Sequence, residues 1–156
     1  MRHSPYTAVY DANVLYPAPL RDFLMRLALT GAYRARWSAQ IHDEWKRNLL
    51  MKRPDLTVDQ VNRTSALMDR AIPDAPFNLK DFPQAALDSW GIEALHPDEF
   101  IVDLWDLDQA AVVEAAQRQR ASLKNPPHTV REYLDKLLQQ KLPETVKLLS
   151  HFEYVL

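Results

Sequence analysis

The sequence predicts an α/β fold, in which a parallel sheet is flanked by helices and followed by a C-terminal helical extension. Two short runs with the composition of strands, at residues 7–10 and 33–37, are each followed by a segment with the apolar spacing of a helix. This alternation is typical of a parallel sheet. From Asp106 onward only helical patterns occur. We therefore expect two domains, at residues 1–105 and 106–156.

The first two helices have clear signals. Leu20, Phe23, Leu24 and Leu27 fall on one face of a helix expected over residues 20–29, which ends before a glycine. In the strand at residues 33–37, aromatic and small apolar side chains alternate with arginines, which predicts one buried face. A serine directly after that strand is suited to cap a second helix.

Capping residues also mark the later helices. Thr57 with Gln60 has the spacing of a capping box and predicts a helix over residues 58–71, which residues 72–77 then break. Residues 92–95 are a short strand candidate. The helices of the extension are expected to start at Asp106, at Thr129 with Glu132 in a second capping box, and at Pro143.

Composition narrows the functional classes. Hydrophobic residues make up 47% and charged residues 26% of the 156 residues, as in globular proteins, and the net charge is −2. Without cysteine, a metal site must use carboxylate, histidine or carbonyl ligands. No apolar run is long enough to cross a bilayer, so we expect no membrane partner and a cytoplasmic location. Residues 1–53 carry nine basic and four acidic residues, a charge of +5 that suits a polyanion or an ordinary solvated surface.

Asp11 stands where the first strand ends. In open α/β sheets ligands gather beyond the carboxyl ends of the strands, so an acid there is well placed to hold a cation. The alternative is structural, because Asp11 and Asn13 also suit a turn in which the side chains cap their own backbone. The residues of this segment alone leave both interpretations open.

Four blocks of the chain together resemble the PIN-domain nucleases, in the branch of the bacterial virulence-associated protein C (VapC) toxins. These toxins are ribonucleases of toxin–antitoxin pairs. The residues after 119, among them Arg120 to Pro127 and Thr129 to Leu134, resemble the helical C-terminal extension of one subgroup. The blocks are Val9-Tyr10-Asp11-Ala12-Asn13-Val14-Leu15-Tyr16-Pro17, Trp37-Ser38 with Ile41-His42-Asp43-Glu44, Asn78-Leu79-Lys80-Asp81-Phe82-Pro83, and Gly91-Ile92-Glu93-Ala94-Leu95-His96-Pro97-Asp98-Glu99-Phe100.

The resemblance implies a catalytic metal site. Carried over by position, Asp11, Glu44 and Asp81 are the ligands of Mg²⁺ or Mn²⁺, and Asn13 and Asn78 lie beside them. Hard divalent ions prefer oxygen ligands and activate water for attack on a phosphodiester. The implied partners are an RNA substrate and a cognate antitoxin. Basic residues are expected to hold the RNA backbone, namely Arg34, Arg36, Lys46 and Arg47.

The chain departs from the family pattern between Ala75 and Asn78, where about one strand–helix unit, on the order of 30 residues, is absent. The absent unit carries a further ligand acid and a strand beside the first one. We expect a natural deletion stabilised by a partner or by exchange of elements between copies, an engineered shortening, or an omitted segment. If the deletion is natural, we expect the chain to form a homodimer or an oligomer whose copies exchange structural elements.

Two functions of different class follow. The leading function is a metal-dependent endoribonuclease toxin. Its activity is expected to be reduced if cleavage requires the absent segment. The alternative is a non-catalytic module that binds the antitoxin or dimerises. The histidines, His42 among them, are expected at the surface or as caps. All four tryptophans are expected in the core, namely Trp37, Trp45, Trp90 and Trp105.

Overall fold

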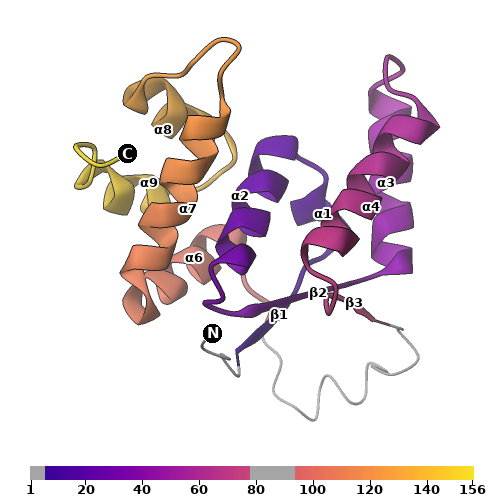
Figure 1. Cartoon of the computed structure of the whole chain (residues 1–156), viewed down its shortest axis with the longest axis horizontal. Coiled ribbons are helices and arrows are strands. Elements are labelled where there is room, and N and C mark those ends of the chain that lie inside the picture. The colour runs from indigo at the N-terminus through magenta and orange to yellow at the C-terminus, as the bar shows by residue number, and fades with distance from the viewer. Residues whose placement is uncertain (1–5, 78–93) are drawn as a thin grey trace. The chain divides into compact units, whose positions relative to one another are not determined.

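The computed structural model describes residues 6–77 and 94–156, which divide into two compact units (Figure 1). We call them the sheet unit, with the described parts of residues 5–16 and 33–94, and the helical unit, with residues 17–32 and 95–156. The sheet unit contains parallel strands with helices, which confirms the α/β class.

The sheet unit follows the predicted order of elements. Its three described strands pair in the order β1-β2-β3, and both pairings are parallel. In the register, Ala8 lies opposite Ala35 and Trp37 lies opposite Pro76. Its elements are β1 (Thr7–Val9), α1 (Ala12–Leu15), β2 (Arg34–Ser38), α3 (Ala39–Lys52), α4 (Val58–Ala71) and β3 (Pro76–Phe77).

Strand β2 has the predicted alternation, whereas β1 is largely exposed. Ala35 and Trp37 are buried while Arg34 is exposed. In β1, by contrast, Val9 is 44% exposed. Among the described residues β1 pairs with β2 alone, so it lies at an edge where one row of backbone groups faces no described strand.

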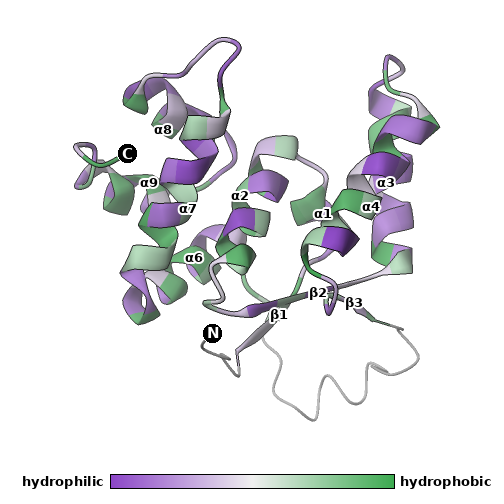
Figure 2. Ribbon diagram, viewed as in Figure 1, coloured by the Kyte–Doolittle hydropathy of each residue, from purple (hydrophilic) through white to green (hydrophobic). Residues whose placement is uncertain are grey.

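Local capping explains where α3 and α4 begin. The Ser38 hydroxyl accepts a hydrogen bond from the backbone N–H of Ile41 at 3.2 Å, as predicted for the start of α3. At the start of α4, the Thr57 hydroxyl accepts from the Gln60 N–H at 3.2 Å. The Gln60 side chain in turn accepts from the Thr57 N–H at 2.8 Å, which completes the predicted capping box. Apolar and polar residues alternate along both helices in Figure 2.

Strand β3 lies in the segment that the sequence predicted only as a break. The Trp37 N–H donates to the Ala75 carbonyl at 3.0 Å, which brings the chain after α4 alongside β2. Proline at position 76 suits the first residue of a strand, where its missing N–H costs nothing. The strand candidate at residues 92–95 falls mostly outside the described residues, and Ala94 and Leu95 have no regular secondary structure.

The helical unit is built around α7. Helices α2 and α6 both pack against α7, and α9 packs against α6 and α8. Gln119 on α7 is buried, donates to the Pro19 carbonyl at 2.9 Å and accepts from the Tyr133 hydroxyl at 2.7 Å. Its helices are α2 (Ala18–Leu29), α6 (Pro97–Leu107), α7 (Gln109–Ser122), α8 (Val130–Gln139) and α9 (Pro143–Ser150).

The helix starts of the extension agree with the sequence except at one position. The capping box of Thr129 and Glu132 is present, and Pro143 opens α9. The prediction that Asp106 caps α7 was wrong, because Asp106 lies inside α6 and Asp108 accepts from the Ala111 N–H at 3.1 Å. The helical unit includes α2 and α6 besides the residues after 105, and a domain boundary at residue 105 stays a prediction.

A buried carboxylate joins α6 to α9. Asp98 is 6% exposed and accepts from the backbone N–H groups of Glu144 (3.0 Å) and Thr145 (2.9 Å) and from the Thr145 hydroxyl (2.7 Å). These donors lie in the first turn of α9, where backbone N–H groups have no partner within the helix. The carboxylate therefore supplies the cap that Leu142, the residue before α9, lacks a side-chain oxygen to provide.

A tyrosine pair in the core of the sheet unit gives a pH-dependence prediction. The buried hydroxyl groups of Tyr10 and Tyr33 are hydrogen-bonded to each other. Burial, together with the neighbouring Tyr33, raises the pKa of Tyr10 well above its ordinary value, and burial also raises the pKa of Tyr33. A pKa that is higher in the folded state gives a stabilisation that is complete below the unfolded value of about 10 and is lost as the pH rises above it.

We therefore expect the free energy of unfolding of the sheet unit to fall between about pH 9 and about pH 12, by up to ~1.4 kcal/mol per pH unit for each tyrosine. Urea unfolding across this range measures it, with tyrosinate absorbance to follow ionisation. A Tyr10→Phe/Tyr33→Phe variant, which cannot ionise there, is the control. An equally steep loss in this variant contradicts the prediction.

Candidate metal centre and nucleic-acid interface

Asp11 is placed by the end of β1 and the start of α1. Its backbone is extended, and its carboxylate Oδ1 accepts from the Val14 N–H at 3.0 Å, so that Asp11 caps α1. The predicted turn is thus observed. The side chain is exposed, and the cap uses one of its two carboxylate oxygens. Capping therefore leaves an oxygen that a cation can bind, and the ligand role stays a prediction.

Glu44 lies on α3, which packs against α1. The side chain of Glu44 is exposed, while Trp45 beside it is completely buried. Asn13 is exposed on α1. Two of the three predicted carboxylate ligands are therefore exposed on contacting elements of the sheet unit.

The third predicted ligand, Asp81, and the neighbouring Asn78 lie outside the described residues. Within the described ranges, no three histidine or acidic side chains come together in a way that could hold a metal ion. The oxygen chemistry of Asp11 and Glu44 fits Mg²⁺ or Mn²⁺, which bind through one or two protein carboxylates and keep several waters. The complete ligand set stays a prediction.

The four predicted RNA-binding residues have different surroundings. Arg36 is half-buried, donates to the Ala75 carbonyl at 3.3 Å, and has its guanidinium 5.5 Å from the centre of the Phe77 ring. It therefore joins β2 to β3. Arg34 and Arg47 are exposed, and no ion pair involving either is found among the described residues.

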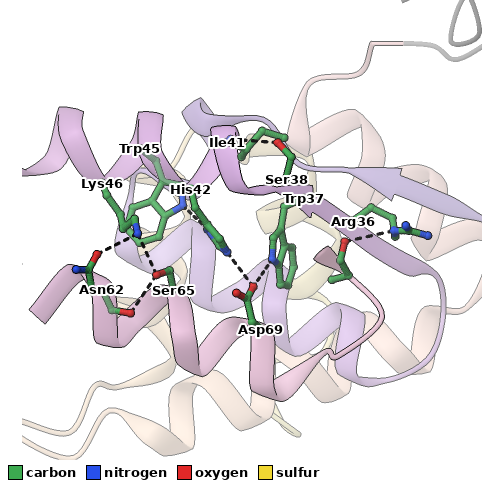
Figure 3. Close-up of polar contacts among 11 residues, drawn as sticks. Arg36, Trp37, Ser38, Ile41, His42, Trp45, Lys46, Asn62, Ser65 and Asp69 are labelled. Atoms are coloured by element: carbon green, nitrogen blue, oxygen red, sulfur yellow. Dashed lines mark hydrogen bonds and ion pairs between the residues drawn. The ribbon is translucent and has the colours of Figure 1, made fainter. Parts of the chain in front are cut away.

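Lys46 joins α3 to α4 beside an open groove. Its ammonium donates to the Asn62 side-chain oxygen at 3.0 Å and to the Ser65 hydroxyl at 3.3 Å (Figure 3). Both acceptors are neutral, and no ion pair involves Lys46 in the described part of the chain. The groove has a volume of about 420 Å³, with Lys46 and Arg47 among its polar lining residues and Leu50, Met51, Val58 and Val61 as its apolar ones.

A polar network that the sequence did not indicate fixes the start of α3. His42 is 6% exposed, which corrects the expectation of a surface or capping histidine. The Trp45 indole N–H donates to His42 Nδ1 at 2.9 Å, and His42 Nε2 lies 2.9 Å from Asp69 Oδ1 (Figure 3). Since an indole nitrogen only donates, Nδ1 is the acceptor and Nε2 carries the proton given to Asp69.

Asp69 also connects this network to the sheet. The Trp37 indole N–H donates to the same Asp69 oxygen at 2.7 Å, so one carboxylate on α4 holds side chains from β2 and α3. Both tryptophans are completely buried, as predicted. Trp105 was also expected in the core but is partly exposed, and Trp90 lies outside the described residues. Glu44 lies between His42 and Trp45 in sequence, and the network therefore holds the helical turn that carries this predicted ligand.

Comparison with known proteins gives independent information on the helical unit. Residues 97–151, which contain α6 to α9, match the family model of the VapC50 C-terminal domain. This part of the chain is similar to the VapC50 C-terminal domain. This match and the curated relative below confirm the resemblance to VapC proteins that the sequence blocks predicted.

A curated relative supports the same family. The chain is 37% identical over 76 residues to the "Putative ribonuclease VapC50" of Mycobacterium tuberculosis. The aligned stretch covers 49% of this chain and 45% of that relative, so the chain spans less than half the length of the VapC50 protein that it matches. No solved structure matches the chain significantly.

Proposed function

We propose that this chain is a metal-dependent endoribonuclease of the VapC toxin type, which hydrolyses RNA phosphodiesters. The observation that carries the proposal is a match to the VapC50 C-terminal domain in a chain whose α/β unit exposes Asp11 at the start of α1 and Glu44 on α3, which contacts α1. Asp81 is the third acid of the proposed site. A cognate antitoxin is the proposed protein partner, and the proposed location is the cytoplasm.

In this proposal Asp11, Glu44 and Asp81 hold Mg²⁺ or Mn²⁺, and Asn13 and Asn78 orient these carboxylates. When bound, the ion supplies Lewis acidity that lowers the pKa of water and neutralises charge on the scissile phosphate. In this proposal no side chain needs to act as a covalent nucleophile, because activated water attacks the phosphorus. Arg34 and Arg47 are exposed and contact the RNA backbone as charges, whereas Arg36 and Lys46 act mainly through the packing contacts described above.

The test is RNA cleavage by the purified chain. We expect product in Mg²⁺ or Mn²⁺ and none in EDTA, with activity restored when the ion is returned. Cleavage that persists in EDTA would contradict a metal-dependent reaction. The test uses the chain in whatever oligomeric state it adopts.

The second candidate is a non-catalytic module that binds an antitoxin or a second copy. Its support is that the chain departs from the family pattern where a further ligand acid is expected, and that Asp11 already has a structural role as a helix cap. Calorimetry with Mg²⁺ and Mn²⁺ separates the two functions. Millimolar or tighter binding that is lost in Asp81→Asn favours the nuclease, whereas absence of binding favours the module.

Among the described residues, none of the helices combines the length and the apolar character that crossing a bilayer requires.

A further inference from the structure

The helical unit exposes a surface of aromatic side chains that its own packing does not cover. Trp105 on α6 and Phe152 after α9 form an edge-to-face pair with ring centres 5.4 Å apart. Phe152 stacks in turn on Tyr154, at 6.2 Å. Tyr154 is 80% exposed, and Trp105 and Phe152 are partly exposed. We call these three residues the aromatic surface.

Helix α6 adds a row of negative charges beside the aromatic surface. Glu99, Asp103 and Asp106 are four and three residues apart, so they lie on one face of α6. All three side chains are exposed. We call them the acidic stripe. At about 100° per residue, Trp105 lies toward one flank of the stripe and Leu107, which is 71% exposed, lies toward the other.

The charge of this surface is not neutralised within the helical unit. No lysine or arginine occurs anywhere from Ala94 to Gln117. In the described part of the chain no ion pair involves the acidic stripe, and the neighbouring Lys147 is paired with Glu144 at 2.9 Å. Glu153, between Phe152 and Tyr154, adds a further exposed negative charge. The acidic stripe and Glu153 therefore place four carboxylates on the segments that carry the aromatic surface, against the Arg120 guanidinium that donates to the Leu156 carbonyl at 2.9 Å.

We infer that the aromatic surface and the acidic stripe together form a docking site for a cationic, amphipathic segment of a partner protein. Apolar side chains of the partner pack on Trp105, Phe152 and Tyr154, and its lysines or arginines face the stripe. Arginine also stacks favourably on aromatic faces. Exposed aromatic residues with a charged rim are typical of protein interaction sites. The inference rests on the helical unit alone and holds whether or not the chain cleaves RNA.

The negative charge also decides between partner classes. Aromatic side chains are suited to stack on the bases of single-stranded RNA, but that mode of binding needs a positively charged groove along the backbone. Here three carboxylates line the surface instead. A cationic peptide is consequently the favoured occupant, and RNA would be repelled.

The test uses the full chain and two labelled peptides, one of repeated Arg-Leu-Arg-Trp units and a matched one of Glu-Leu-Glu-Trp units. In fluorescence anisotropy we expect the arginine peptide to bind and the glutamate peptide not to bind. Asp103→Lys/Asp106→Lys should weaken binding by about tenfold, because it replaces two attractions with repulsions. Tyr154→Ala should weaken it by about fivefold, since a tyrosine anchor is removed.

Control variants and competing occupants complete the test. Asp135→Lys is the charge control, because Asp135 is exposed on α8 and its replacement changes the net charge by as much as each substitution in the acidic stripe. This variant should bind the arginine peptide like the unmodified chain. Circular dichroism shows that each variant is folded. Equal binding of the arginine peptide by all variants would overturn the inference, as would tight binding of labelled single-stranded poly(U) that is lost in Tyr154→Ala. Sedimentation showing a dimer that Tyr154→Ala dissociates would assign the surface to a second copy instead.

Discussion

Replacing Asp11 by asparagine is expected to lower the rate of RNA cleavage by at least about 100-fold while leaving the fold intact. Asparagine is as good an N-cap as aspartate, and its side-chain oxygen can still accept from the Val14 N–H. The substitution therefore removes the negative charge offered to the metal ion and keeps the hydrogen bond that starts α1. Loss of one carboxylate from a magnesium site that depends on few protein ligands should weaken binding and catalysis together.

Initial cleavage rates in Mn²⁺ and thermal unfolding of the same samples measure both effects. Asp59→Asn, a change of an exposed acid in the first turn of α4, is the matched control and should cleave like the unmodified chain. Asp11→Ala should lose the cap as well, with an added destabilisation of about 1 kcal/mol. Equal rates for the unmodified chain and Asp11→Asn would remove this carboxylate from the mechanism.

Replacing Asp98 by alanine is expected to reduce the free energy of unfolding of the helical unit by about 3 kcal/mol. The change leaves two backbone N–H groups and a hydroxyl of α9 without their acceptor in a buried position. Hydrogen bonds to a charged acceptor each contribute ~1.5–3 kcal/mol, and the contributions are not additive. The loss also removes a negative charge from the positive end of the α9 dipole.

Urea unfolding gives the free energy, and hydrogen–deuterium exchange of residues 143–150 gives the local effect. We expect faster exchange in α9 of Asp98→Ala, and a smaller change in Asp98→Asn, which retains one oxygen acceptor. Asp103→Ala removes an exposed acid of the same helix and should change the stability by less than about 0.5 kcal/mol. Unchanged exchange in α9 of Asp98→Ala would show that this carboxylate does not support the helix.

The helices were predictable because their signals are local. Ser38, Thr57 with Gln60, and Thr129 with Glu132 each satisfy backbone groups within three residues, so the sequence alone shows where these helices start. Strand β3 was missed because its two residues contain a proline and pair with β2 across nearly forty residues of chain. Such pairing depends on tertiary contacts and leaves no periodic pattern in so short a segment.

The residues of the candidate site also differ in whether the sequence could predict them. Asp11 and Glu44 were named through the resemblance to VapC toxins, and their exposure agrees with a ligand role without testing it. The contact of His42 with Asp69 was not foreseen, because the two residues are 27 positions apart and neither belongs to a local motif. A signal was present in the sequence, since Trp45 three residues after His42 places an indole donor on the same helical face.

Binding of Mn²⁺ tests the central claim most directly, because it reports on the metal site without requiring an RNA substrate. In electron paramagnetic resonance the signal of free aqueous Mn²⁺ falls when the ion binds to protein. We expect it to fall with the unmodified chain and to be largely restored in Asp11→Asn and Glu44→Gln, with Asp59→Asn behaving like the unmodified chain. The same loss of signal in all four proteins, or none with the unmodified chain, would contradict a divalent metal site formed by these carboxylates.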